Sequence, residues 1–248
     1  MLNYTRILAK KQNPEFIKSR DVLRKLSIDI QLNDIQLAVN PMDDELEPIK
    51  TASIAFPRSE IFENSKKTKE TSYEAIGEWI EDRAKEKKGI IIHPGDFSKS
   101  LPFIVKTLSV VKKPVPILLK SDGYYSEATA NFLKKIIDVN IINFRYISND
   151  CSAVLIGNID YPDVAKRSLL TAKKSGHLIV NHEILPSHIE CDSKPILEWI
   201  KANLDACQLK ILGNYKPDIG SHREIARDLT ITEYNDVMKH AKMIGLDI

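Results

Sequence analysis

Short apolar segments alternate with amphipathic segments along most of the chain, and this alternation predicts a parallel α/β sheet. The apolar segments are continuous runs rather than strict every-second-residue patterns, which is typical of strands buried on both faces. Between them, apolar residues recur at helical spacing. The six predicted strands cover residues 52–56, 90–92, 115–119, 139–144, 177–184 and 208–212.

Helix start and stop signals separate these strands. Residues 71–74 and 230–233 have the Thr-x-x-Glu order of a capping box, in which hydroxyl and carboxylate satisfy free backbone donors. Ser193 is predicted to cap a helix that buries Ile196, Leu197 and Ile200. Strand–helix units of this kind favour a parallel sheet with right-handed crossovers, and six are too few for a closed eight-stranded barrel. The pattern predicts an α/β fold, a six-stranded parallel half-barrel or (β/α)6 partial TIM barrel, with a doubly wound sheet as the alternative.

Residues 1–50 lack this alternation and are predicted to be a short N-terminal extension. Asn13 and Pro14 have the order of a helix start, and residues 28–32 alternate apolar with polar side chains, as in a strand or hairpin. An acidic segment between Pro41 and Pro48 is interpreted as a connector to the barrel at residues 51–248.

Composition excludes several classes of function. The 248 residues include 36 Lys and Arg against 34 Asp and Glu, so the basic excess of a dedicated nucleic-acid binder is missing and RNA is a weak partner hypothesis. No run of about 18 apolar residues predicts a membrane helix. The nine glycines form neither a phosphate-binding loop nor a dinucleotide fingerprint. Three cysteines and no signal-type start favour a cytoplasmic protein without a disulfide framework.

Polar residues follow nearly every predicted strand, at the edge where parallel sheets place their sites. This predicts a ligand-binding mouth. Its proposed lining residues are His93, Gly95, Asp96, Lys120, Ser121, Asp122, Asn143, Arg145, His182 and Asn214. His182 is also the candidate catalytic acid or base, because imidazole titrates near neutral pH. We expect it to be structural: a neutral ring beside Asn143 and Arg145 with visible hydrogen-bond partners.

The densest group of potential metal ligands lies at residues 182–192, where two histidines accompany Glu190, Cys191 and Asp192. These side-chain types suit zinc. Their spacing, however, matches no standard metal loop, and only one cysteine is near. We therefore expect a polar turn at the strand end and no metal.

Residues 182–191, His-Glu-Ile-Leu-Pro-Ser-His-Ile-Glu-Cys, resemble the Arg-His-Leu-Val-Leu-Pro-Gly-His-x-Glu-Cys run of radical S-adenosylmethionine proteins related to pyruvate formate-lyase activating enzyme. Further similar segments occur in the same order, over about residues 47–248. They include residues 47–56, Ser-Asp-Gly-Tyr at 121–124, residues 138–146, Asn-Asp-Cys-Ser-Ala at 149–153, residues 161–165, Trp199 and Asn-Tyr-Lys-Pro at 214–217. The resemblance implies the same six-stranded partial barrel.

The chain departs from that family in the segments that bind the family's iron–sulfur cluster and S-adenosylmethionine. The family's Cys-x-x-x-Cys-x-x-Cys loop, whose thiolates hold a four-iron cluster, corresponds to residues 57–64, which contain no cysteine. We therefore expect no iron–sulfur cluster, with S-adenosylmethionine or a nucleotide left as a weak candidate ligand. His93-Pro-Gly-Asp96 stands where the family has a Gly-Gly-Glu-Pro-like turn for the methionine amino group. Asn143 replaces an Asp, and Asn181 replaces an Arg.

Three functions stay open on the sequence. The favoured one is a non-catalytic binding or regulatory module, whose partner is a small anion or an unknown protein. The second is an enzyme that uses Lys120, Arg145 and His182 for non-radical chemistry. The third is a structural subunit of a protein or RNA assembly, which uses the extension and the recurrent Lys pairs.

Overall fold

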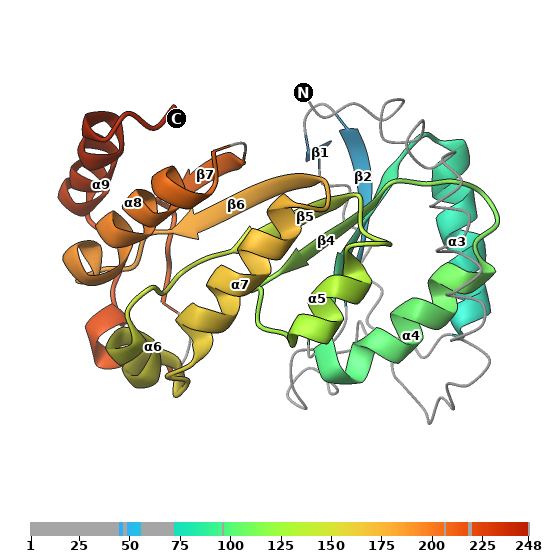
Figure 1. The fold of residues 1–248 in the computed structure, drawn as a ribbon, viewed down its shortest axis with the longest axis horizontal. Coiled ribbons are helices and arrows are strands. Elements are labelled where there is room, and N and C mark those ends of the chain that lie inside the picture. The colour runs from blue at the N-terminus through green and yellow to red at the C-terminus, as the bar shows by residue number, and fades with distance from the viewer. Residues whose placement is uncertain are drawn as a thin grey trace. The chain divides into compact units, whose positions relative to one another are not determined.

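Six parallel strands alternate with helices, and the predicted α/β fold of half-barrel type is confirmed (Figure 1). The computed structural model describes residues 45–46, 49–55, 72–95, 97–205, 207–217 and 220–247. The expected helix and strand of the N-terminal extension lie outside these residues. The chain divides into two compact units: the first runs to Ser121 and includes Phe132–Val139, and the second holds Asp122–Asn131 and Asn140–Ile248.

The first unit contains neighbouring strands of the sheet whose side chains are mostly aliphatic. A short strand β1 (Glu45–Leu46) pairs antiparallel with β2 (Ile49–Ala55), which pairs in parallel with β3 (Gly89–His93). Strand β4 (Ile117–Ser121) continues in parallel, with Leu118 opposite Ile91. Ile90, Ile91 and Ile92 are all at most 2% exposed, so both faces of β3 are covered, as its uninterrupted apolar run predicts.

Two helices of the first unit pack closely on each other: α3 (Tyr73–Lys85) and α4 (Phe97–Val110). Ser72 caps α3 by accepting a hydrogen bond from the amide of Ala75, one residue later than the predicted capping box. Gly77 explains the close approach of the helices, because a Cβ there would lie 2.6 Å from the side chain of Val110.

In the second unit, β6 (His177–Glu183) pairs in parallel with β7 (Gln208–Leu212), with His182 opposite Ile211. Helix α5 (Glu127–Leu133) and strand β5 (Val139–Asn143) straddle the division between the units. The helices within the second unit are α6 (Asn149–Ile156), α7 (Tyr161–Lys173), α8 (Lys194–Asn203) and α9 (Ile231–Met243). A π-helical turn, η2 (Ile189–Ser193), precedes α8, and a 3-10 turn, η3 (Arg223–Ile225), precedes α9.

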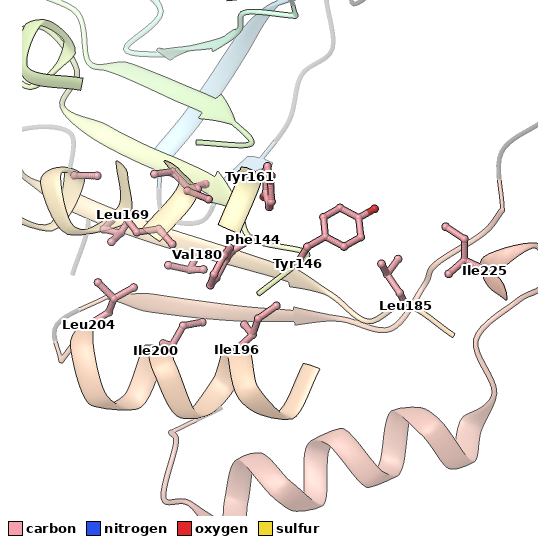
Figure 2. Packing of buried hydrophobic residues seen from close by; sticks show 14 residues of the cluster. Phe144, Tyr146, Tyr161, Leu169, Val180, Leu185, Ile196, Ile200, Leu204 and Ile225 are labelled. Atoms are coloured by element: carbon pink, nitrogen blue, oxygen red, sulfur yellow. The ribbon is translucent and has the colours of Figure 1, made fainter. Parts of the chain in front are cut away.

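The core of the second unit centres on Phe144, which is fully buried directly after β5. Figure 2 shows its ring among Leu169 of α7, Val180 of β6 and Ile196 of α8. The ring of Trp199 meets it edge-on at 5.6 Å between centroids. Fully burying side chains of this size contributes about 1.5–3 kcal/mol each, so this cluster fixes the strand ends that carry the polar groups described below.

Two predicted helix starts have different outcomes. Thr230 and Glu233 form the expected capping box of α9, with both reciprocal hydrogen bonds present. Ser193, predicted to cap α8, makes no side-chain capping bond. Ile196, Leu197 and Ile200 are nevertheless buried as expected. Among the described residues, no helix is both long and apolar enough to cross a membrane.

Candidate functional site

A chain of hydrogen bonds joins polar side chains at the carboxyl ends of β5 and β6. The amide of Asn143 donates to the carboxylate of Asp122 at 3.0 Å, and the amide of Asn181 donates to the side-chain oxygen of Asn143 at 3.2 Å. The hydroxyl of Tyr161 donates to the backbone carbonyl of Asn143 at 3.0 Å. Two predicted mouth residues, Asp122 and Asn143, are therefore joined directly.

Arg145 and Glu183 form an ion pair at the same strand ends, with 2.9 Å between Nη2 and Oε2. Burial opposes the charge of Arg145, but the carboxylates of Glu183 and Asp122 outweigh that effect and raise the pKa of the guanidinium. Two atoms of this group are buried without a hydrogen-bond partner, Arg145 Nε and Asn181 Oδ1. Leaving such an atom unpaired costs about 1–3 kcal/mol, so this part of the site has unused binding capacity.

The other predicted mouth residues are divided between the two units. In the first unit, His93 ends β3, Gly95 adopts a positive φ of 60°, and Lys120 and Ser121 end β4. In the second unit, Asn214 is exposed in the segment after β7. The remaining one, Asp96, lies outside the described residues.

His182 is fully buried, and both of its ring nitrogens have partners. Nδ1 lies 2.9 Å from the carbonyl oxygen of Phe144, and Nε2 lies 3.0 Å from the hydroxyl of Ser193. Because a carbonyl only accepts, Nδ1 carries the proton and Nε2 accepts from Ser193. Burial lowers the pKa of His182 to about 4. The expected neutral ring is present, but burial causes it rather than a neighbouring guanidinium, and the partners are Phe144 and Ser193.

The π-helical turn η2 gathers a second polar group in this unit. The amides of Asp192 and Ser193 both donate to the carbonyl of His188, and the bond from Ser193, five residues on, is the wider closure that defines a π turn. Residues three and four apart share one side of a helical turn. His188, Cys191 and Asp192 therefore lie on the same side, and helix α6 brings Cys151 next to them.

The prediction that this chain holds neither an iron–sulfur cluster nor another metal is wrong. The structure assembles four side chains that could hold a metal ion. One ligand atom from each of Cys151, His188, Cys191 and Asp192 lies within 4.8 Å of all the others. The sulfurs of Cys151 and Cys191 are 3.2 Å apart, and Cys191 Sγ is 3.3 Å from His188 Nδ1. Only one cysteine, Cys191, is near in the sequence, whereas the second, Cys151, lies 40 residues away along the chain.

Asp192 is 1% exposed and its two carboxylate oxygens have different surroundings. Oδ1 accepts hydrogen bonds from the amides of Ile147 and Ser148 at 2.7 and 2.9 Å. Oδ2 is buried without a hydrogen-bond partner, and it lies 3.9 Å from His188 Nδ1. Burial raises the pKa of the Cys191 thiol to about 12 and that of the Cys151 thiol above its usual value.

Comparison with known proteins supports the fold. No protein-family model matches the chain. An uncharacterized protein of Methanocaldococcus jannaschii is 29% identical over 177 residues, which cover 66% of this chain and 52% of that protein. This chain therefore spans about half the length of that relative.

Among solved structures, the crystal structure of Streptococcus suis SuiB bound to S-adenosylmethionine matches with a TM-score of 0.55 and 11% identity. The match covers 72% of this chain and 42% of SuiB. At this identity the match shows a shared fold, the α/β partial barrel described above.

Proposed function

We propose that this chain is a non-catalytic binding module, related to the pyruvate formate-lyase activating enzyme branch, that binds a small charged molecule at the carboxyl ends of β5 and β6. The observation that carries this proposal is the pair of buried polar atoms without partners in that group, Arg145 Nε and Asn181 Oδ1. Native proteins pair nearly all such atoms with protein, water or ligand. A bound polar molecule supplies the partners that the chain itself does not.

The charges of the group favour a ligand that carries both signs, and S-adenosylmethionine is the first candidate. A carboxylate of the ligand meets the planar guanidinium of Arg145, and an ammonium or sulfonium meets the carboxylate of Glu183. The support from comparison is that SuiB, whose fold is similar, was crystallised with S-adenosylmethionine bound.

The surroundings of His182 favour binding over catalysis. A general acid or base must reach the proton that it transfers, within hydrogen-bond distance or through one water. His182 is fully buried and already uses both ring nitrogens within the chain.

We place the protein in the cytoplasm, since its three cysteines are free thiols.

Titration calorimetry of the full chain tests this proposal, with S-adenosylmethionine, S-adenosylhomocysteine and ATP as separate ligands. We expect heat with S-adenosylmethionine and a roughly 10- to 100-fold weaker Kd for Arg145→Gln, since hydrogen bonds to charged groups contribute about 1.5–3 kcal/mol. Arg167→Gln is the matched control, because Arg167 is exposed and its guanidinium donates to the carbonyl of Tyr125 at 3.3 Å, outside the proposed ligand site.

Two results would contradict the proposal. The absence of heat with all three ligands, in protein with an intact melting transition, would favour the structural subunit of a protein or RNA assembly. Turnover of a ligand that depends on Lys120 or Arg145 would favour the enzyme instead.

A further inference from the structure

Two thiols, one imidazole and one carboxylate converge beside α6, independently of the proposed ligand site. Cys151 lies in the first turn of α6, and the other three side chains come from the π turn and the residue before it. From this convergence we propose a zinc site, with Cys151, His188, Cys191 and Asp192 as its four ligands. The site joins two chain segments that are 37 to 41 residues apart (188 − 151 and 192 − 151).

The spacing of the ligand atoms suits a single small metal ion. Zinc bonds of about 2.0–2.3 Å in a tetrahedron place neighbouring ligand atoms roughly 3.3–3.8 Å apart. The structure has 3.2 Å between the two sulfurs, 3.3 Å from Cys191 Sγ to His188 Nδ1, and 3.9 Å from that nitrogen to Asp192 Oδ2. The four ligand atoms all lie within 4.8 Å of one another, so shifts of at most about one ångström would bring them to zinc distances.

Asp192 is prepared to act as the fourth ligand. Two backbone amides hold Oδ1 and so fix the direction of Oδ2 toward the cluster. That second oxygen is buried with no hydrogen-bond partner, an arrangement that is costly for a carboxylate unless a cation balances it. A metal ion at the centre of the four side chains removes this cost.

Glu224 completes the surroundings of His188. When a histidine binds a metal through one ring nitrogen, the other carries a proton and usually donates it to a carboxylate or carbonyl. His188 Nε2 is buried without a hydrogen-bond partner, and Oε2 of Glu224 in η3 lies 3.4 Å away. Glu224 is therefore a positioning residue: it holds the proton of Nε2 and leaves Nδ1 free to bind the metal.

The ligand types select the metal and its role. Thiolate and imidazole ligands favour zinc and disfavour magnesium and calcium, which require oxygen ligands. Four protein ligands fill a tetrahedron, and sites of that kind stabilise structure rather than activate a water molecule. The zinc ion would therefore hold α6 against the π turn.

Metal analysis of the full chain, purified in reducing buffer and passed through gel filtration, tests the site. We expect about one zinc ion per chain, and after exchange a cobalt derivative with a thiolate-to-cobalt charge-transfer band in the near ultraviolet. Cys151→Ser and Cys191→Ser should each lose the metal and the band. Cys207→Ser, the matched control, should keep both. If the cysteine variants do not fold, as judged by circular dichroism, His188→Gln carries the same test.

The second measurement concerns Glu224 and uses competition with a zinc chelator. Loss of such an outer carboxylate typically weakens metal binding about 10- to 100-fold, so Glu224→Gln should weaken zinc binding while the cobalt band persists. Glu190→Gln is the control, because Glu190 is exposed and pairs with Lys194. An unchanged affinity in Glu224→Gln would overturn the role of Glu224 alone.

Other results would overturn the zinc site itself. Reduced wild-type protein that retains no zinc and gives no cobalt band would do so. Iron recovered together with inorganic sulfide would assign the thiols to a cluster. A Cys151–Cys191 disulfide that persists in reducing buffer would assign the short sulfur–sulfur distance to a covalent bond. None of these results affects the proposed ligand at β5 and β6, which calorimetry measures separately.

Discussion

Two buried histidines, His182 and His188, lie six positions apart (188 − 182) in the second unit and have opposite surroundings. His182 lies one residue before the end of β6, and each of its ring nitrogens has a hydrogen-bond partner. His188 precedes the π turn, its Nε2 has no hydrogen-bond partner, and its Nδ1 faces a thiol and a carboxylate. Burial is therefore a poor guide to what a histidine does, whereas its hydrogen-bond state is a good one.

This difference separates a structural polar contact from a candidate site. A ring with both nitrogens paired within the chain has no bonding capacity left for a ligand. A buried ring beside an unpaired carboxylate oxygen has such capacity, and buried polar atoms rarely stay unpaired in native proteins. Polar residues expected at strand ends follow the same division, since Arg145 and Asn181 retain unpaired atoms and His182 does not.

The largest expected effect is that of zinc on thermal stability. Free zinc at a thousandfold excess over Kd stabilises a protein that binds it only when folded by about 4 kcal/mol, so the melting temperature of reduced, metal-free protein should rise. Calorimetric melts with and without zinc measure this rise. His188→Gln should abolish it, whereas His182→Gln should keep most of it. Equal effects of the two substitutions would remove the distinction between the histidines.

The next effect is a pH dependence that belongs to His182. Burial lowers the pKa of the folded ring to about 4, below the ordinary value of 6.5, so the unfolded chain binds the proton more readily. The neutral His182 ring therefore contributes fully to the free energy of unfolding above about pH 6.5. This contribution declines as the pH falls toward 4, by about 3 kcal/mol in total. Urea unfolding of metal-free wild type and His182→Gln, compared over this range, should show a steeper decline for wild type. Parallel declines would contradict the assignment.

A smaller effect is expected from truncation of each ring in metal-free protein. His182→Ala leaves the Phe144 carbonyl and the Ser193 hydroxyl without their partner, which should lower the free energy of unfolding by about 1–3 kcal/mol. His188→Ala should cost less, because its ring loses only longer contacts, from Nδ1 to Cys191 Sγ at 3.3 Å and from Nε2 to Glu224 Oε2 at 3.4 Å. Urea unfolding followed by tryptophan fluorescence measures both. A larger loss for His188→Ala would reverse the comparison.

The smallest effect is expected at the third cysteine. Cys207 is half-buried at the edge of the core around Phe144, away from the four proposed ligands. Cys207→Ser should therefore change the free energy of unfolding by no more than about 1 kcal/mol and leave the zinc-induced shift unchanged. The same melts check it. Loss of the shift would mean that the wrong cysteines have been assigned to the metal.

Much of the fold was predictable because hydrophobic periodicity reports burial directly. Strand β7 has the predicted bounds, and β6 ends one residue before the predicted end. The predicted start of β2 at Ala52 missed Ile49, Lys50 and Thr51, since two polar residues interrupt the apolar run there. Capping chemistry identified the start of α9, because the reciprocal hydrogen bonds of Thr230 and Glu233 form between residues three apart.

The metal cluster was not predictable in the same way. A π turn has no distinct sequence signal, so its effect on Ser193 and on the residues before it could not be inferred from capping preferences. The partnership of Cys151 with Cys191 depends on how α6 packs, which is a tertiary property. The only local signal was the spacing His188-x-x-Cys191-Asp192, which places three ligands on one side of a helical turn.

The divided carboxylate of Asp192 has a consequence for observing this protein in solution. Because Oδ1 accepts from the amides of Ile147 and Ser148 while Oδ2 faces the cysteines and His188, a charge change at the cluster acts on both amides through a single side chain. Their nuclear magnetic resonance shifts and hydrogen-exchange rates would report events at the sulfurs from the backbone. Occupancy of the metal site could then be followed at individual amides without replacing zinc by cobalt.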